Sequence, residues 1–190
     1  MVSHYAQKLA AVVFGGSIYT STDAGVNWTE RTNAGVQDWS SIASSSDGTN
    51  LAAVEFGGFI YTSTDAGASW TERTDAGSRS WWQIAFSSDG TNLAAVAQPG
   101  YIYTSTDAGV NWTEQTNAGS RNWRSIASSS DGTNLAAVVS SGYIYTSTDA
   151  GATWMEQTDA GSRGWRSIAS SSDGTNLAAV VLGGSIWTYA

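Results

Sequence analysis

The chain has 190 residues, of which 41% are hydrophobic and 13% charged, and its formal net charge is −8. This composition is typical of one globular domain with a sizeable core and argues against disorder. The acidic balance argues against a general nucleic-acid binder, whose affinity rests on clustered Lys and Arg, and the absence of cysteine excludes disulfides and cysteine metal sites.

The first segment differs from the rest of the chain. Met1 is followed by VSHYAQK, which has no basic stretch leading into an apolar run, and nowhere do 18 apolar residues follow one another. We therefore expect neither a signal peptide nor a membrane span, and the sequence assigns no compartment. This segment also holds the only histidine, His4, and the only lysine, Lys8, which leaves few side chains for acid–base catalysis.

A constant period of 42 residues organises the rest of the sequence. It is visible in three series of identical residues: Asp23, Asp65, Asp107 and Asp149; Trp28, Trp70, Trp112 and Trp154; Leu9, Leu51, Leu93, Leu135 and Leu177. A fixed period near 40 is typical of stacked supersecondary units. We therefore expect a tandem-repeat architecture rather than a single irregular fold.

One repeat, residues 123–164, shows what each unit contains. Four short segments in it have strand composition, and each is followed by a Gly, Asp, Asn or Ser cluster. In chain order they read WRSIASS, LAAVV, YIYTST and WMEQT, and we name the predicted strands A, B, C and D. No segment has helical periodicity, and the short loops suit antiparallel hairpins. Four strands per repeat predict an all-β fold, a β-propeller of four-stranded blades, with A innermost.

The repeat length sets the expected number of blades. Because 190/42 is about 4.5, we expect one propeller domain over 1–190 with five blades. The first blade lacks most of strand A and the last lacks strand D. A ring completed by half-blades of a second chain is the alternative, which makes the chain a homo-oligomer, and a fragment is a further one. The expected partial blades are 1–38 and 165–190, and the full blades are 39–80, 81–122 and 123–164.

A second period lies inside the first. GVNW and TNAG occur in units one and three, whereas GASW or GATW and TDAG occur in units two and four. This alternation favours natural amplification of a two-blade unit. A designed or reconstructed repeat protein is the alternative.

Between predicted strands C and D every complete unit carries the pattern Ser-x-Asp-x-Gly-x-x-Trp. We interpret it as a turn, in which Asp accepts backbone N–H groups two residues on, Gly supplies a left-handed conformation, and Trp anchors strand D. The residues of these structural boxes are Asp23, Gly25, Trp28, Asp65, Gly67, Trp70, Asp107, Gly109, Trp112, Asp149, Gly151 and Trp154.

The A–B turns repeat a second acidic motif, SDGTN, in which Asp-Gly is a strong hairpin signal. Its aspartates are Asp47, Asp89, Asp131 and Asp173. Both kinds of turn are expected at the same rim of the propeller. Calcium needs six to eight oxygen ligands and each box offers one carboxylate, so we predict no metal site.

The sequences STDAGVNW, STDAGASW and STDAGATW resemble the Asp-box, or bacterial neuraminidase repeat, of sialidases and of many non-enzymatic propellers. The resemblance covers nearly the whole chain. It implies a sialidase-like β-propeller in which the box is a structural turn remote from any catalytic centre, so that the fold alone does not give the chemistry.

The D–A and B–C loops are expected on the face opposite the boxes, where a ligand would bind. Arg124 and Arg166 lie there, and the B–C loops EFGG, AQPG, VSSG and VLGG differ most between units. Arginine beside tryptophan can hold a carboxylate or stack on a sugar. The alternative interpretation is solvated arginines and packed tryptophans. The candidate ligand-binding residues are Arg79, Arg121, Arg163, Trp81, Trp82, Trp123 and Trp165.

No set of residues predicts catalysis. Glu55 is the only carboxylate at an unrepeated position near the expected binding face, and one carboxylate cannot flank a glycosidic bond. We therefore expect a non-enzymatic protein with no catalytic residues and no cofactor. The leading hypothesis is a multivalent, lectin-like carbohydrate-binding module. A structural or protein-binding propeller is the alternative, and a degenerate sialidase that uses Glu55 is a third.

Overall fold

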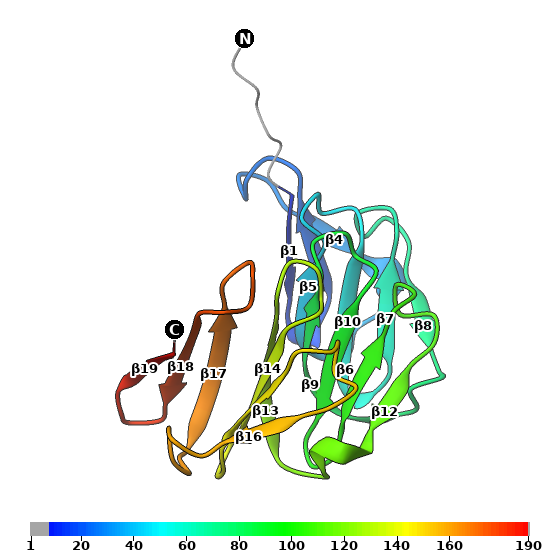
Figure 1. Cartoon of the computed structure of the whole chain (residues 1–190). Helices are drawn as coiled ribbons and strands as arrows, with labels where there is room; N and C mark the ends of the chain where they lie inside the picture. Colours follow the sequence, from blue (N-terminus) through cyan, green and yellow to red (C-terminus); the bar gives the residue numbers. More distant parts are fainter. Residues whose placement is uncertain (1–7, 190) are drawn as a thin grey trace.

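The computed structural model describes residues 8–189 and consists of antiparallel sheets that stand side by side (Figure 1). The all-β prediction is therefore confirmed. Residues 1–7, which include His4 and the end of the first predicted strand A, lie outside the described residues, as does Ala190.

Three units of the described chain have four strands in the predicted order A–B–C–D. The A strands are β5 (Gln37–Ser44), β9 (Arg79–Phe86) and β13 (Trp123–Ser128), and the B strands are β6 (Leu51–Gly58), β10 (Leu93–Ala97) and β14 (Leu135–Val139). The C strands are β7 (Ile60–Ser63), β11 (Ile102–Ser105) and β15 (Ile144–Ser147), and the D strands are β8 (Thr71–Arg73), β12 (Thr113–Gln115) and β16 (Met155–Gln157).

The first and last units have three strands each in the described chain. The first contains the B, C and D strands β1 (Leu9–Val12), β3 (Ile18–Ser21) and β4 (Thr29–Arg31), and the last contains the A, B and C strands β17 (Trp165–Ser170), β18 (Leu177–Val181) and β19 (Ile186–Tyr189). A short strand β2 (Phe14–Gly16) pairs with β5.

Two single turns of 3-10 helix, η1 (Thr32–Ala34) and η2 (Thr116–Ala118), interrupt the β structure. Both occupy a TNA sequence, whereas the TDA sequences at the same place in units two and four form turns without a helix. No segment of the sequence has helical periodicity, and these single turns are too short to show one. They show that the two-blade alternation has a structural counterpart.

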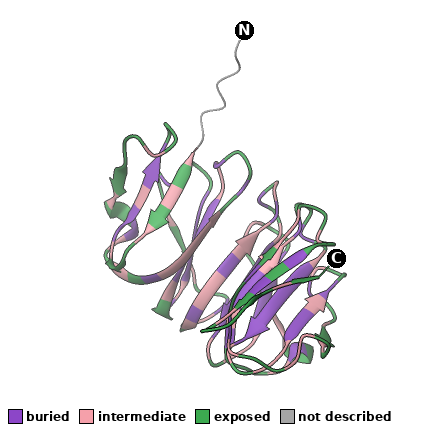
Figure 2. Ribbon diagram, turned by 90° about the vertical axis from the view of Figure 1, so that its left-hand side faces the viewer, coloured by how far each residue is buried: buried purple, intermediate pink, exposed green. Residues whose placement is uncertain are grey.

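The hydrophobic core lies between neighbouring sheets rather than within one of them. Trp123 and Ile126 of strand β13 pack against Ala94, Val96 and Ile102 of the preceding unit. Alternate side chains of a strand point to opposite faces, so each sheet between the first and the last packs against the preceding unit with one face and against the following unit with the other. Figure 2 shows the buried segments concentrated in the strands and the exposed ones mainly in the loops.

The loops gather at two ends of the sheets as predicted. At one end, the box and the A–B turn of the same unit are joined by backbone hydrogen bonds, such as that from Ala108 N–H to Thr91 C=O. At the other end, Gly100 of a B–C loop pairs with Arg121 of the next D–A loop. We name the first end, with the eight box and A–B turn aspartates, the Asp-box rim. The second end is the arginine rim, with Arg79, Arg121, Arg124, Arg163 and Arg166.

Candidate functional site

The Asp-box is a closed network of local hydrogen bonds. In the third unit, Ser105 Oγ donates to Asp107 Oδ1 at 2.8 Å and accepts from Gly109 N–H at 3.0 Å. Asp107 Oδ1 accepts from Asn111 N–H at 2.9 Å, and Trp112 Nε1 donates to Gly109 C=O at 3.0 Å. The aspartate therefore accepts a hydrogen bond from the backbone N–H four residues further along the chain. The prediction that it accepts from the N–H two residues on was wrong, because that N–H, of Gly109, donates to the serine Oγ instead.

Two consecutive residues in each box are left-handed. The predicted glycines have φ between 81° and 89°, and the alanines just before them, such as Ala108, have φ between 57° and 59°. A left-handed alanine costs roughly 1–2 kcal/mol. The hydrogen bonds of the serine and aspartate hold this conformation in place, so the box is a turn stabilised by its own side chains.

The A–B turns follow the predicted geometry. Asp89 Oδ1 accepts from Thr91 N–H, two residues on, at 3.0 Å. These hydrogen bonds lower the pKa of all eight aspartates of the Asp-box rim, to about 2 for Asp47, Asp65 and Asp107. Among residues 8–189 no three acidic or histidine side chains form a group that could hold a metal ion.

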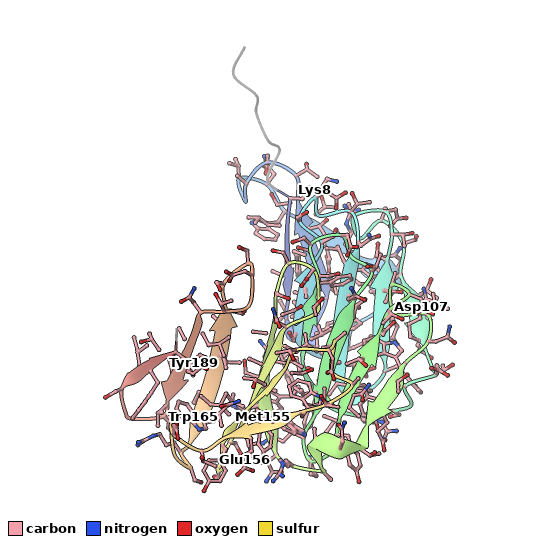
Figure 3. All side chains as sticks on the ribbon, viewed as in Figure 1. Lys8, Asp107, Met155, Glu156, Trp165 and Tyr189 are labelled. Carbon is pink, nitrogen blue, oxygen red and sulfur yellow. The ribbon has the colours of Figure 1, made fainter. Side chains whose placement is uncertain are left out.

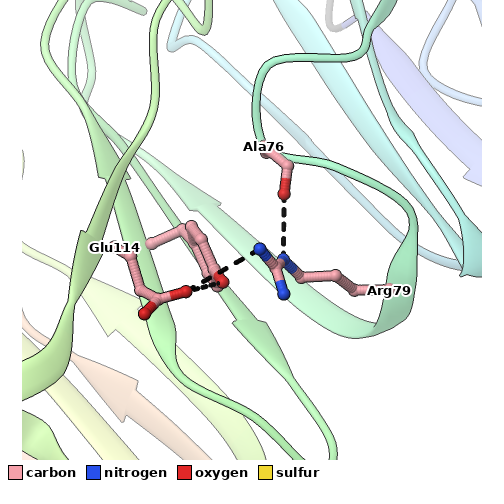
Figure 4. A network of polar contacts seen from close by, with 4 residues as sticks. Ala76, Arg79 and Glu114 are labelled. Atoms are coloured by element: carbon pink, nitrogen blue, oxygen red, sulfur yellow. Dashed lines mark hydrogen bonds and ion pairs between the residues drawn. The ribbon is translucent and has the colours of Figure 1, made fainter.

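At the opposite rim, three neighbouring groups hold Arg79 in place (Figure 4). Its Nε donates to Ala76 C=O at 2.9 Å, its guanidinium lies 4.6 Å from the centre of the Tyr103 ring, and its Nη2 is 3.7 Å from Glu114 Oε2. The guanidinium is therefore positioned by one carbonyl, one aromatic face and one carboxylate. Its side chain remains 39% exposed, so the outer N–H groups still face solvent.

The other two predicted loop arginines repeat this arrangement. Arg121 lies 4.7 Å from the Tyr145 ring and Arg163 lies 4.1 Å from the Trp187 ring, and each donates through Nε to the carbonyl three residues earlier. Arg79–Glu114 is the one ion pair of the described chain. Arg121 and Arg163 therefore keep a charge that an anionic ligand could compensate.

The tryptophans that follow these loops do not reach the surface. Trp81, Trp123 and Trp165 have no exposed area, and Trp123 packs edge-on against Tyr145 with ring centres 5.1 Å apart. Their indole N–H groups have no hydrogen-bond acceptor. These three rings offer no surface to a ligand, and their position is that of packing between blades.

Trp82, which lies within β9, is different because it is partly exposed. Phe56 packs edge-on against it at 5.9 Å, and the Arg124 guanidinium lies 4.0 Å from its ring. Partial burial and the nearby charge of Arg166 lower the pKa of Arg124. Phe56, Trp82, Arg124 and Arg166 thus form one cationic and aromatic row on the arginine rim. Phe56 was not predicted, and its only sequence signal was its place in the variable loop EFGG.

Tyrosines on the C strands form hydrogen bonds with glutamates of the neighbouring D strands. Tyr145 donates to Glu156, and burial together with this hydrogen bond raises its pKa to about 12. Burial and the hydrogen bond to Glu72 likewise raise the pKa of Tyr61. A nucleophilic tyrosine would need a lowered pKa. Glu55 accepts a long hydrogen bond from Phe59 N–H in its own loop, at 3.4 Å.

Charge separates the two rims. The Asp-box rim carries four box aspartates and four A–B turn aspartates, whereas the arginine rim carries five arginines together with acidic residues of its own loops and strand ends, Asp38, Glu55, Asp75 and Asp159. Positive charge is concentrated at Arg124 and Arg166, which lie close enough for each charge to act on the other. Such a local pair of cations attracts anionic ligands even to a protein whose net charge is negative. The described residues contain no helix that is long and apolar enough to cross a membrane.

Solved structures of propellers have the same fold. A structure of YCF48 bound to D1 peptide matches with a TM-score of 0.72 and 21% identity over 96% of this chain and 60% of that chain. The GH74 enzyme of Niastella koreensis matches with a TM-score of 0.77 and 16% identity over 96% and 34%. The Cps50 (Swd1) β-propeller domain of Myceliophteria thermophila matches with a TM-score of 0.72 and 14% identity over 96% and 67%.

These likenesses show the fold, a β-propeller arrangement of antiparallel sheets, and the chain spans only part of the first two proteins. No protein-family model matches the chain, and no curated protein matches it significantly. The resemblance to Asp-box repeats therefore rests on the boxes themselves.

Proposed function

We propose that this chain is a non-enzymatic binding propeller that holds a carboxylate-bearing peptide or protein segment on its arginine rim. The observation that carries the proposal is the row of Phe56, Trp82, Arg124 and Arg166, in which two neighbouring cations lie beside two partly exposed rings. Guanidinium groups bind carboxylates through paired hydrogen bonds, and exposed rings add apolar contact. The structure of YCF48 bound to D1 peptide provides a precedent on the same fold.

A peptide fits the rim better than the glycan of the leading sequence hypothesis. Carbohydrate recognition in several equivalent sites would need one exposed ring per blade, and Trp81, Trp123 and Trp165 are completely buried. Trp82 is the one predicted tryptophan with accessible surface, and Arg124 covers one of its faces. The loop arginines Arg79, Arg121 and Arg163 extend the positive surface around the row, which suits an extended acidic segment.

Two parts of the proposal concern the whole chain. The described units form five blades of one propeller, and a ring completed by a second chain is the alternative. Light scattering separates them, since a single-chain mass supports the first and a multiple supports the second. The proposal includes the absence of catalysis, which is supported by the raised pKa of Tyr145 and by the single long hydrogen bond of Glu55. Turnover of a fluorogenic sialoside that is lost in Glu55→Gln would contradict it.

The binding site is tested by fluorescence anisotropy of a labelled Asp–Phe repeat peptide at two salt concentrations. We expect saturable binding that weakens with salt, and a loss of about tenfold or more in the double variant Arg124→Ala/Arg166→Ala, because anchor arginines dominate such sites. Arg73→Ala is the matched control, since Arg73 donates to Thr62 on the outer strands. Binding of sialyllactose but not of the peptide would instead favour the lectin hypothesis. If the double variant bound the peptide as tightly as the unchanged protein does, Arg124 and Arg166 would not form the binding site.

A further inference from the structure

The loops of the arginine rim carry different charges in different units. In Figure 3 this rim lies at the end of the sheets near the labelled Trp165, and the labelled Lys8 marks the opposite end. From the D–A loop into the following strand, the sequence reads GSRSWW, GSRNWR and GSRGWR in the third, fourth and fifth units. The second unit reads GVQDWS. It therefore has no arginine at either position and carries an aspartate, Asp38.

The B–C loop of the second unit adds another carboxylate. Glu55 stands at the position where the third, fourth and fifth units have Ala or Val. It lies opposite Trp39 in the pairing of β5 with β6, and Asp38 comes directly before that tryptophan. Both acidic residues therefore lie next to Trp39, at the start of the innermost strand of the second unit.

These two carboxylates have no cation beside them within the described chain. Asp38 is exposed, and Glu55 is half-buried with one hydrogen bond of 3.4 Å from Phe59 N–H. The single ion pair of residues 8–189 joins Arg79 to Glu114 and involves neither of them. A cationic group of a ligand can therefore approach these carboxylates without displacing an internal ion pair.

Hydrogen bonds between the innermost strands fix the order of the units around the rim. Ser40 Oγ of β5 donates to Trp81 C=O of β9 at 2.9 Å. Gln83 Oε1 of β9 accepts from Ile126 N–H of β13 at 2.7 Å. The third unit therefore lies between the second and the fourth, and all three are in direct contact near the rim.

The row of the proposed site continues from the acidic residues. Phe56 follows Glu55 in the same loop and packs on Trp82 with ring centres 5.9 Å apart. The Arg124 guanidinium lies 4.0 Å from the Trp82 ring. From the second unit to the fourth, the rim thus changes from carboxylates to aromatic rings and then to cations.

The distance across these units suits a short extended peptide. Packed sheets are about 10 Å apart, and the blades are closest at their innermost strands, so two steps cover at most about 20 Å. An extended chain rises about 3.3 Å per residue, so a segment of about seven residues reaches from the carboxylates to the cations.

We infer that the segment bound on the arginine rim has separated charges, with basic residues at one end, an aromatic residue in the middle and acidic residues at the other end. The basic end lies beside Asp38 and Glu55, the aromatic residue beside Phe56 and Trp82, and the acidic end beside Arg124. Complementary charges at both ends favour this ligand and fix its orientation. The inference rests on the proposed function, because it uses the same row, and it specifies the ligand of that site further.

The test compares three labelled peptides by fluorescence anisotropy at low salt. KKGFGDD has separated charges, KDGFGKD has the same composition with mixed charges, and GGGFGDD has only the acidic end. We expect KKGFGDD to bind about fivefold more tightly than either of the others, since two exposed charge pairs contribute modestly. Because exposed pairs are screened by ions, this preference should disappear at high salt.

Substitutions then assign the preference to the second unit. In the double variant Asp38→Asn/Glu55→Gln, the affinity for KKGFGDD should decrease to that for KDGFGKD, whereas GGGFGDD should bind at least as tightly as before. Unchanged binding of GGGFGDD also shows that the double variant is folded. Asp159→Asn is the matched control, because it removes an exposed carboxylate from the same rim outside the second unit. It should keep the preference for KKGFGDD.

The outcomes separate this inference from the proposed function. If GGGFGDD binds but KKGFGDD binds no more tightly than KDGFGKD, the inference is wrong and the acidic-peptide site stands. A preference for KKGFGDD that persists in the double variant would also overturn the inference, because the basic end would then bind elsewhere. If none of the three peptides binds, the proposed function and the inference are both wrong.

Discussion

The two rims of the molecule are built from the same repeat but use its polar residues in different ways. On the Asp-box rim, side chains bond within a few residues of themselves, as Ser105, Asp107 and Gly109 do. On the arginine rim, guanidinium groups lie on aromatic rings and keep N–H groups for solvent, as Arg121 does. A polar side chain whose hydrogen-bond donors and acceptors are all satisfied within its own turn stabilises the fold. A side chain that keeps unpaired donors can bind a ligand.

The largest expected effect comes from the tryptophans under the arginine rim. Trp123→Ala should lower the free energy of unfolding by about 3–5 kcal/mol, because it leaves a large cavity between two sheets. Urea denaturation measures this, with Trp28→Ala as the control because the Trp28 side chain is 44% exposed in the first unit. A small change in the free energy of unfolding for Trp123→Ala would mean that this ring does not belong to the core. Trp123 would then again be a candidate ligand-binding residue.

The next effect is acid sensitivity of the Asp-box rim. Hydrogen bonds hold the pKa of Asp65 and Asp107 at about 2, below the ordinary value of 3.8. A lowered folded-state pKa contributes stability that is fully present above about pH 4 and is lost as the pH falls toward 2. Thermal unfolding followed between pH 5 and pH 2 should show a steep decrease in Tm over this window. A flat profile would contradict the hydrogen-bond networks of the rim.

A single box should matter much less than a buried tryptophan. Asp107→Ala removes the acceptor for Asn111 N–H and should cost about 1 kcal/mol, the usual contribution of such a hydrogen bond. Binding of an acidic peptide to the opposite rim should not change, since Asp107 lies at the other end of the sheets. Urea denaturation and the anisotropy assay together separate these readouts. If Asp107→Ala folded normally but no longer bound the acidic peptide, the binding site would lie on the Asp-box rim.

Much of the fold was predictable because the repeat is nearly exact. The strand segments LAAVV and WRSIASS appear as β14 and β13, and the loops lie at the predicted rims. The hydrogen-bond partners of the box were not predictable, since Ser105 and Asp107 compete for the same N–H groups and only the backbone geometry decides between them.

The candidate site was less predictable than the fold. A tryptophan beside an arginine looks the same in the sequence whether it is buried, as Trp81 is, or partly exposed, as Trp82 is. In β9 the register with β10 shifts between Trp81 and Gln83, so that Trp82 is an extra residue without a partner on β10. Such a β-bulge redirects the side chain next to it, and the sequence does not show where the bulge lies. Phe56 joins Trp82 across two units, and a contact between variable loops has no period that the sequence could reveal.

The smallest expected effect on stability is that of replacing Arg121. In contrast to Asp107, this residue is expected to affect binding more than folding. Arg121→Gln keeps a side chain able to donate to Ala118 C=O and loses only an exposed cation above Tyr145, so its cost should stay within about 0.5 kcal/mol. Its affinity for the acidic peptide should nevertheless decrease severalfold, because Arg121 has no carboxylate partner in the described chain. Urea denaturation and the anisotropy assay measure the two effects on the same preparation. A large loss of stability with unchanged affinity would assign the loop arginines to the fold and would leave binding to Arg124 and Arg166 alone.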